Sequence, residues 1–255
     1  MPRADTWSAD RLVSYLSETR YEQGLLLGKM KDLGYQLKNE ATLAALTEET
    51  VKSSAIEGEE LSADSVRSSL ARQMGLEARG TRPADRHVEG IVEMMLDATQ
   101  NYASPLTEER ILGWHAALFP TGRSGLRKIQ TEAWRMGPME VVSGPEGRQN
   151  VHFEAPAAEQ LELKMREFLT WYEDSTAAIE PLIKVGLAHL YFVTIHPLED
   201  GNGRIARAIT EMSLGASRTA GSGSIACLRR SGRSARATTK FLSRLKRAGW
   251  MLQNG

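Results

Sequence analysis

The segment between residues 196 and 207 restricts the possible folds of this chain more than any other segment does. It reads HPLEDGNGRIAR. It follows the apolar stretch 181–195, which we expect to form a buried central helix, and it leads into a second helical repeat of apolar residues. Glycine permits positive φ angles and close backbone approach, so Gly201 and Gly203 allow consecutive N–H groups to converge on an anion where the second helix begins. The segment therefore predicts a helix–loop–helix unit with an anion-binding turn.

The polar side chains of this segment fit phosphate chemistry. Arg204 and Arg207 lie near one face of the second helix and can donate charge-assisted hydrogen bonds to phosphate oxygens. Asp200 offers a single carboxylate, the usual way in which magnesium joins a protein to phosphates. His196 has an ordinary pKa near physiological pH and could take a proton from an attacking hydroxyl. A glycine turn or a helix-capping histidine alone is more often structural, but their combination in one short segment favours a functional site.

The segment resembles the signature of the Fic family, His-Pro-Phe-x-(Asp/Glu)-Gly-Asn-Gly-Arg-x-x-Arg. It matches everywhere except Leu198, where phenylalanine is usual, and we expect this side chain to pack inward. The similarity extends over about residues 7–214. It implies a Fic-type helical bundle with the activity of a protein adenylyltransferase. Such an enzyme transfers AMP from ATP to a serine, threonine or tyrosine hydroxyl of a target protein and releases pyrophosphate.

The resemblance also implies a role for each residue of the loop. His196 would be the general base that activates the target hydroxyl, and Asp200 would bind Mg²⁺. ATP and Mg²⁺ are therefore the expected substrate and cofactor. Positioning and charge stabilisation would supply most of the catalysis. The residues that would hold the phosphates are Gly201, Asn202, Gly203, Arg204 and Arg207.

A second motif lies at residues 53–58, which read SSAIEG. It resembles the inhibitory pattern of the family, (Ser/Thr)-x-x-x-Glu-(Gly/Asn), with Ser53, Glu57 and Gly58 at the defined positions. By this resemblance Glu57 would pair with Arg207 in the place of the γ-phosphate, so that ATP binds with its α-phosphate misaligned. Such a pair is strong where it is partly desolvated and well aligned. Glu57 could instead be a solvated helix-end residue, but the presence of both motifs favours inhibition.

Two short β-prone runs, 140–142 and 150–153, flank the turn-forming stretch SGPEG and predict a β-hairpin. The hairpin resembles the flap of the Fic family, whose strand edge aligns an extended stretch of the target by main-chain pairing. The resemblance assigns Met139, Val141 and Val142 to the flap. Taken alone, the segment would be an ordinary surface hairpin; its place before His196 favours the flap.

Helical spacing dominates the remaining sequence. Apolar residues recur every three or four positions between residues 12 and 56, and Glu57 with Gly58 predicts a helix end. We expect Thr107 to cap a later helix. The fold class is mostly α with one hairpin. Further helices are expected at 62–73, 87–101, 107–118, 159–172 and 181–195. The chain divides into an N-terminal helical region with the inhibitory helix (1–75), a catalytic core (86–214) and a basic tail (215–255).

Composition narrows the partners and the location. The 32 basic and 32 acidic residues balance, so no global field attracts nucleic acid or acidic membranes. The single cysteine excludes an internal disulfide framework and fits a reducing compartment. The N-terminus lacks an apolar signal core, and the longest apolar stretch, 182–195, is too short to span a bilayer. We expect a cytoplasmic protein without a membrane partner.

The tail from residue 215 has a different character. No Asp or Glu follows Glu211, while Arg and Lys accumulate among small residues. A basic tail could bind nucleic acid, but this one lacks interleaved aromatic residues and any nucleic-acid-binding motif, which makes that partner a poor fit. The other interpretation is a shifted reading frame. Back-translated with suitable codons and read one nucleotide away, residues 223–230 resemble the stretch that follows the loop in relatives. Such a shift would leave the loop intact and the adenine pocket incomplete, and the gene sequence across codons 214–222 decides between the two.

Three functions compete at this point. The first is AMP transfer restrained by Glu57. The second is removal of AMP, or transfer of another phosphate-bearing group, because binding orientation decides which bond breaks. The third is a nucleotide-binding regulator or inactive Fic protein, whose N-terminal helices offer a surface for a homodimer or another partner. The remaining histidines lack metal-ligand spacing and are expected to be packing or surface residues. These are His87, His115, His152 and His189.

Overall fold

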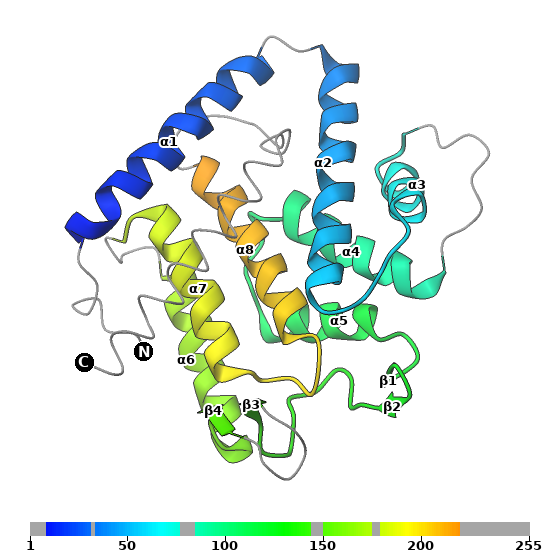
Figure 1. The fold of residues 1–255 in the computed structure, drawn as a ribbon, viewed down its shortest axis with the longest axis vertical. Helices are drawn as coiled ribbons and strands as arrows, with labels where there is room; N and C mark the ends of the chain where they lie inside the picture. The colour runs from blue at the N-terminus through cyan, green and yellow to red at the C-terminus, as the bar shows by residue number, and fades with distance from the viewer. Residues whose placement is uncertain (1–8, 32–33, 77–84, 144–149, 175–178, 220–255) are drawn as a thin grey trace.

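The computed structural model describes residues 9–31, 34–76, 85–143, 150–174 and 179–219, and in these ranges it is mostly helical (Figure 1). The helices are α1 (Ala9–Lys31), α2 (Tyr35–Ile56), α3 (Ala63–Gln73), α4 (Arg86–Gln100), α5 (Glu108–Leu118), α6 (Leu161–Glu173), α7 (Pro181–Ile195) and α8 (Asn202–Thr219). A short 3₁₀ turn, Ala158–Gln160, precedes α6. The predicted fold class is confirmed.

Two antiparallel hairpins complete the described structure. The predicted one pairs β3 (Glu140–Ser143) with β4 (Asn150–Glu154), with an irregularity in register after Val141. Its connecting loop, 144–149, lies outside the described residues. The second hairpin, β1 (Arg123–Ser124) with β2 (Arg127–Lys128), was not predicted, because strands of two polar residues show no alternation of apolar and polar positions.

The main hydrophobic core lies between α7, α8 and the helices around them. Phe168 of α6 and Phe192 of α7 are fully buried, as are Ile205 and Ile209 of α8. Phe168 and Tyr191 meet edge to face, with ring centroids 5.3 Å apart. Because α7 and α8 pack along each other (Figure 1), the loop that joins them is held at both ends by the core.

A second cluster joins the N-terminal helices to this core. It contains Leu46 of α2, Leu70 of α3 and Val92 of α4. The neighbouring α4 residues Ile91 and Met95 belong to the main core, so α4 contributes to both clusters. Through this shared helix the N-terminal helices join the core, and the C-terminal end of α2 lies beside the start of α8.

Local sequence signals set several helix starts. The Thr107 hydroxyl accepts a hydrogen bond from the Arg110 N–H at 3.2 Å, which confirms the predicted cap of α5. The Glu180 carboxylate accepts from the Ile183 N–H at 3.0 Å, and Pro181 occupies the first turn of α7. The same Glu180 pairs with Arg20 at 2.6 Å, which links α1 to the start of α7.

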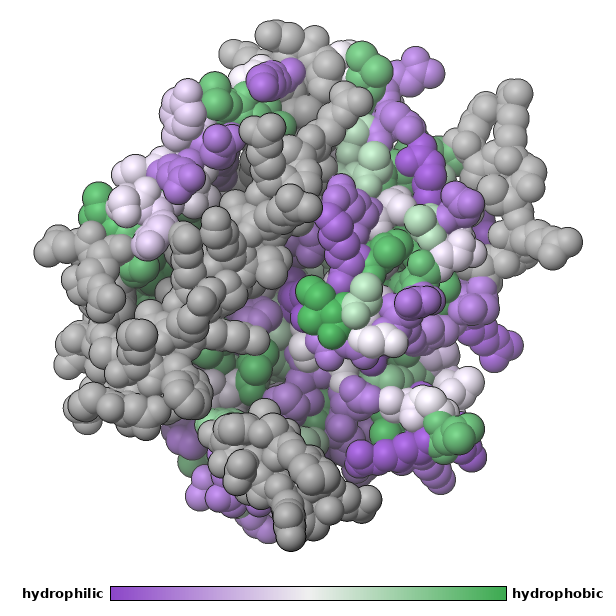
Figure 2. Space-filling model, in the orientation of Figure 1, coloured by the Kyte–Doolittle hydropathy of each residue, from purple (hydrophilic) through white to green (hydrophobic). Residues whose placement is uncertain are grey.

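Close backbone packing joins α4 and α5. A Cβ on Gly90 would overlap the Ala117 carbonyl, so only glycine allows this approach. Among the coloured side chains in Figure 2, many are hydrophilic, and the apolar ones form separate patches. Within the described residues we find no helix that is both long and apolar enough to cross a membrane.

The tail is only partly described. Helix α8 continues past residue 214 to Thr219. Residues 220–255, which carry most of the basic tail and the proposed frame shift, lie outside the described residues.

Candidate active site

The loop of residues 196–201 joins α7 to α8, as the sequence predicted. His196 ends α7 in the left-handed conformation, with φ 50° and ψ 57°. Its N–H donates to the Phe192 carbonyl at 2.9 Å, and its own carbonyl accepts from Nε of Arg135 at 2.8 Å. The backbone of the predicted base is therefore fixed from both directions.

The imidazole of His196 has a defined tautomer. Its Nδ1 lies 3.2 Å from the Val193 carbonyl oxygen, which can only accept a hydrogen bond. Nδ1 therefore carries the proton in the neutral ring, and the lone pair is on Nε2. Burial lowers the pKa of His196 below its ordinary value, although the bond to Val193 acts in the opposite direction. A neutral ring with a basic Nε2 is the form that a general base requires.

Asn202 closes the loop on itself. Its side-chain oxygen accepts from the Leu198 N–H at 3.0 Å, and its side-chain nitrogen donates to the Leu198 carbonyl at 2.8 Å. Leu198 is fully buried, which confirms the prediction that it packs inward. The Asn202 side chain thus stabilises the turn, and any contact with phosphate falls to its backbone N–H.

The first turn of α8 presents backbone N–H groups to the site. Gly201 has φ 79°, and its carbonyl accepts the helical hydrogen bond from the Ile205 N–H at 3.0 Å. The N–H groups that precede this bond have no acceptor within the helix, because of helix geometry. A Cβ on Gly203 would overlap Oε1 of Glu57. The carboxylate of Glu57 therefore lies directly against the helix N-terminus.

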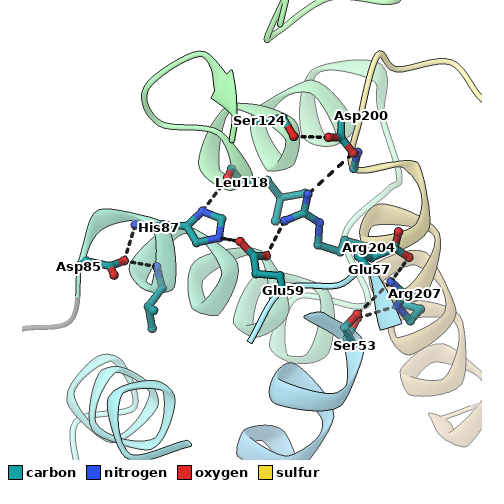
Figure 3. A network of polar contacts seen from close by, with 12 residues as sticks. Ser53, Glu57, Glu59, Asp85, His87, Leu118, Ser124, Asp200, Arg204 and Arg207 are labelled. Carbon is teal, nitrogen blue, oxygen red and sulfur yellow. Dashed lines mark hydrogen bonds and ion pairs between the residues drawn. The ribbon is translucent and has the colours of Figure 1, made fainter. Parts of the chain in front are cut away.

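Glu57 and Ser53 both bind Arg207 (Figure 3). Nη2 of Arg207 donates to Oε1 of Glu57 at 2.5 Å and to the Ser53 carbonyl at 3.1 Å, and its Nε donates to the Ser53 hydroxyl at 2.6 Å. Helix α2 ends at this point, and Gly58 follows with φ 80°, as predicted for a helix stop. The two motifs quoted from the sequence meet in space.

Arg204 has a different carboxylate partner, which the sequence did not indicate. Its Nη1 donates to Glu59 at 2.8 Å, and its Nη2 lies 3.9 Å from Asp200. The guanidinium lies 4.9 Å from the ring centroid of Phe119, and only 7% of the side chain is exposed. Arg204 is therefore a largely buried cation beside the first turn of α8.

His87 holds Glu59 from the opposite side (Figure 3). Its Nε2 contacts the Glu59 carboxylate, and its Nδ1 lies 3.1 Å from the Leu118 carbonyl oxygen. Both partners accept hydrogen bonds, so both ring nitrogens carry protons. The bond to Glu59 raises the pKa of His87, and the bond to His87 lowers the pKa of Glu59. Nothing in the sequence indicated that His87, a partly exposed residue, takes part in the polar network beside the loop.

Asp200 lies at the outer edge of the loop. One carboxylate oxygen accepts from the Gly201 N–H at 2.5 Å, and the other contacts the Ser124 hydroxyl. The side chain is 41% exposed, so further lone pairs face solvent. Among the described residues no group of three or more potential ligands could hold a metal ion. The arrangement fits Mg²⁺, which binds proteins through one or two carboxylates and completes its shell with phosphates and water.

A cavity of about 600 Å³ opens beside Asp200 and Arg204. Its walls come from the end of α2, the start of α4, the β1–β2 hairpin and the loop before α8. The charged residues of its lining are Glu57, Glu59, Asp85, Arg86, His87, Arg123, Asp200 and Arg204. The cavity therefore opens the site to solvent on the side where Glu57 and Glu59 lie.

Arg135 is a further residue that the sequence did not single out. It is 2% exposed, and its guanidinium donates to three backbone carbonyls: Nε to His196, Nη1 to Gly137 at 2.5 Å and Nη2 to Pro156 at 2.6 Å. Gly137 precedes β3 and Pro156 follows β4. This buried side chain therefore ties both ends of the hairpin to the loop of residues 196–201.

The hairpin itself forms where the sequence predicted it, and its role as a flap stays a prediction. Val141 pairs with Phe153 and Val142 with Val151, and the Met139 carbonyl accepts from the Ala155 N–H at 2.9 Å. The β3–β4 sheet has two strands, and no other strand within the described residues pairs with the outer edge of either.

Comparison with known proteins matches two family models to the chain. Residues 105–214 match the Fic/DOC family, and residues 4–76 match a domain of unknown function, DUF4172. The curated protein adenylyltransferase fic-1 of Caenorhabditis elegans is 36% identical over 50 residues, 19% of this chain and 10% of that protein. The Caenorhabditis briggsae protein of the same name is 34% identical over 61 residues, 24% of this chain and 12% of that protein. The matches thus span about a tenth of these relatives.

Solved structures share the fold at low sequence identity. A Fic domain containing signaling protein from Bacteroides thetaiotaomicron superposes with a TM-score of 0.58 at 21% identity, over 79% of this chain and 72% of that one. Fic-1 of C. elegans gives 0.56 at 19% identity, over 81% and 59% of the two chains. At these identities the similarity establishes the fold alone.

Proposed function

We propose that the Fic/DOC family domain of this chain, residues 105–214, is a protein adenylyltransferase that Glu57 holds in an inhibited state. It transfers AMP from ATP to a hydroxyl side chain of a target protein. The DUF4172 region, residues 4–76, includes Glu57 and thus supplies the inhibitory segment.

The position of the Glu57 carboxylate carries this proposal. It pairs with Arg207 and lies against Gly203 at the N-terminus of α8. Helix N-termini and arginine side chains both bind carboxylate and phosphate groups by the same charge-assisted hydrogen bonds. The place that Glu57 occupies therefore suits a phosphate, and a nucleotide can use it when Glu57 moves away.

His196 supplies the base for the transfer. Its Nε2 takes the proton of the target hydroxyl, whose oxygen attacks the α-phosphorus of ATP. The bond from this phosphorus to the oxygen that bridges to the β-phosphate breaks, and pyrophosphate leaves with the bonding electrons. The N–H groups at the start of α8 stabilise the charge on the α-phosphate oxygens. Asp200 would hold Mg²⁺, which would supply positive charge to neutralise part of this negative charge.

The flap orients the target. An extended segment that pairs with the free edge of β3, beside Val141 and Val142, gains main-chain hydrogen bonds without a strict sequence requirement. Since Arg135 joins the base of the hairpin to the His196 carbonyl, the segment on the flap is held at a fixed distance from the base. This arrangement supports a protein substrate rather than a small molecule.

Self-labelling with α-phosphate-labelled ATP and Mg²⁺ tests the proposal. The unaltered chain is compared with Glu57→Gly and with Glu57→Gly combined with His196→Ala. Glu60→Gly is the matched control, because Glu60 is an exposed glutamate of the same segment. We expect label on Glu57→Gly, little on the unaltered chain and Glu60→Gly, and none once His196 is also replaced.

Other results would favour the competing functions. Nucleotide binding without label in any variant would favour a regulator. Label that persists after His196→Ala would refute the role of this histidine as base. Release of AMP from a protein that was adenylylated beforehand, faster with Glu57 in place, would favour AMP removal.

A further inference from the structure

The three-residue segment 57–59 holds both arginines of the phosphate loop, each through its own carboxylate. Glu57 pairs with Arg207, and Glu59 pairs with Arg204. We propose that Glu59 is a specificity-determining residue of the nucleotide site: while it holds Arg204, that guanidinium is withheld from the second phosphate of the nucleotide. This inference rests on the proposed function and concerns a residue outside the inhibitory motif.

Not every hydrogen-bond donor of Arg204 has an acceptor within the described residues. Its Nε is buried and makes no hydrogen bond within the described part of the chain; Nη1 donates to Glu59 at 2.8 Å, and Nη2 lies 3.9 Å from Asp200, beyond hydrogen-bond distance. A guanidinium carries five N–H donors in a fixed fork that matches carboxylate or phosphate groups. A buried donor without an acceptor costs free energy, so a phosphate oxygen that met this fork would be favoured.

The two arginines are one helical turn apart on α8, beside the N–H groups of its first turn. The carboxylates of Glu57 and Glu59 thus place two anions at successive positions along one helix end. A nucleoside diphosphate or triphosphate presents anions in the same succession, whereas a monophosphate presents one. The charge pattern therefore fits a polyphosphate chain that displaces both carboxylates.

Glu59 is held more firmly than a surface glutamate. Its side chain is 30% exposed, and its second contact is with the His87 imidazole, which donates to it. His87 is fixed in turn by the Leu118 carbonyl and by the start of α4, where the Asp85 carboxylate accepts from the His87 N–H at 3.0 Å. Removal of Glu57 alone therefore takes the carboxylate from Arg207, which keeps its bonds to Ser53, and leaves Arg204 paired with Glu59.

Calorimetric titration with ADP and with AMP, both with Mg²⁺, tests the inference in the full chain. The variants are Glu57→Gly, and Glu57→Gly combined with Glu59→Gln, Glu59→Ala or the control Glu60→Gln. A freed charge-assisted contact to the second phosphate should strengthen ADP binding about tenfold in both Glu59 variants. AMP binding should change less than about twofold, because AMP lacks that phosphate. The Glu60 control should bind both nucleotides as Glu57→Gly does.

Each other outcome overturns the inference. Weaker ADP binding in the Glu59 variants would mean that Glu59 positions Arg204 for phosphate. Equal changes for AMP and ADP would mean that Glu59 acts on the whole loop, and unchanged ADP affinity in variants with native thermal midpoints would remove its role. The titration needs no transfer, so its result is independent of the labelling experiment. Binding of neither nucleotide by any variant would overturn the proposed function as well.

Discussion

Arg135 joins the β3–β4 hairpin to the loop of residues 196–201, and the stability cost of its replacement can be worked out from its hydrogen bonds. The Arg135→Met variant keeps most of the aliphatic side-chain volume and removes the three nitrogen atoms, Nε, Nη1 and Nη2, that donate these hydrogen bonds. It leaves the carbonyls of Gly137, Pro156 and His196 without the guanidinium partner seen in the structure. The arginine is 2% exposed, so these carbonyls lie in a region with little access to water.

The expected cost follows from hydrogen-bond energetics. Each buried carbonyl without a partner costs about 1–3 kcal/mol. Removal of the buried cation offsets part of this cost, because burial of the charge is itself unfavourable. The same burial lowers the pKa of Arg135. We therefore expect the free energy of unfolding to fall by about 3 kcal/mol. In the Glu57→Gly background, self-labelling should fall with it, since His196 and the flap lose their common anchor.

Urea denaturation, monitored by circular dichroism, measures this cost. Arg127→Met is the matched control, because the Arg127 side chain is 69% exposed and lies 3.9 Å from Glu199; it should change stability by less than about 0.5 kcal/mol. Arg135→Lys keeps the charge without the fork and should give an intermediate loss. A loss below about 1 kcal/mol for Arg135→Met would refute the reasoning.

Two further predictions concern packing and pH. Gly90→Ala should lower the free energy of unfolding by about 3 kcal/mol, because the added Cβ would overlap the Ala117 carbonyl. Gly113→Ala should raise it by about 0.5–1 kcal/mol, since Gly113 lies on a helix with open space around it. Equal urea midpoints for the two variants would contradict this prediction. His87 has a raised pKa, so its contact with Glu59 stabilises the fold fully below the ordinary value of 6.5 and is lost as pH rises through the raised value. The stability difference between the native chain and His87→Gln should therefore shrink as the pH rises above 6.5 and through the raised pKa of His87, and a difference independent of pH would refute the charged pair.

The helices and the loop could be predicted because their signals are local. Helix α7 has the predicted bounds, 181–195, since Pro181 opens it and the glycine-rich loop ends it. Thr107 caps α5 through a residue three positions away. Such signals need no knowledge of the fold.

The polar network around the loop could not be predicted, because its partners are distant in sequence. Glu59 lies 28 residues from His87 and 145 from Arg204, and no spacing in the chain marks either pair. Glu59 also stands between Gly58 and Glu60 in an acidic run, which is typical of a solvated face. Arg135 owes its role to a fold that brings Gly137, Pro156 and His196 together.

The central claim is that the chain transfers AMP to protein, and following the α-phosphate and the γ-phosphate of ATP separately tests it most directly. The Glu57→Gly variant is incubated with Mg²⁺ and with ATP labelled either at the α-phosphate or at the γ-phosphate, and the label on protein is counted. The account predicts that α-label becomes attached to protein and that γ-label leaves with pyrophosphate. Attachment of γ-label, or of neither label by a variant that binds ATP, would contradict it.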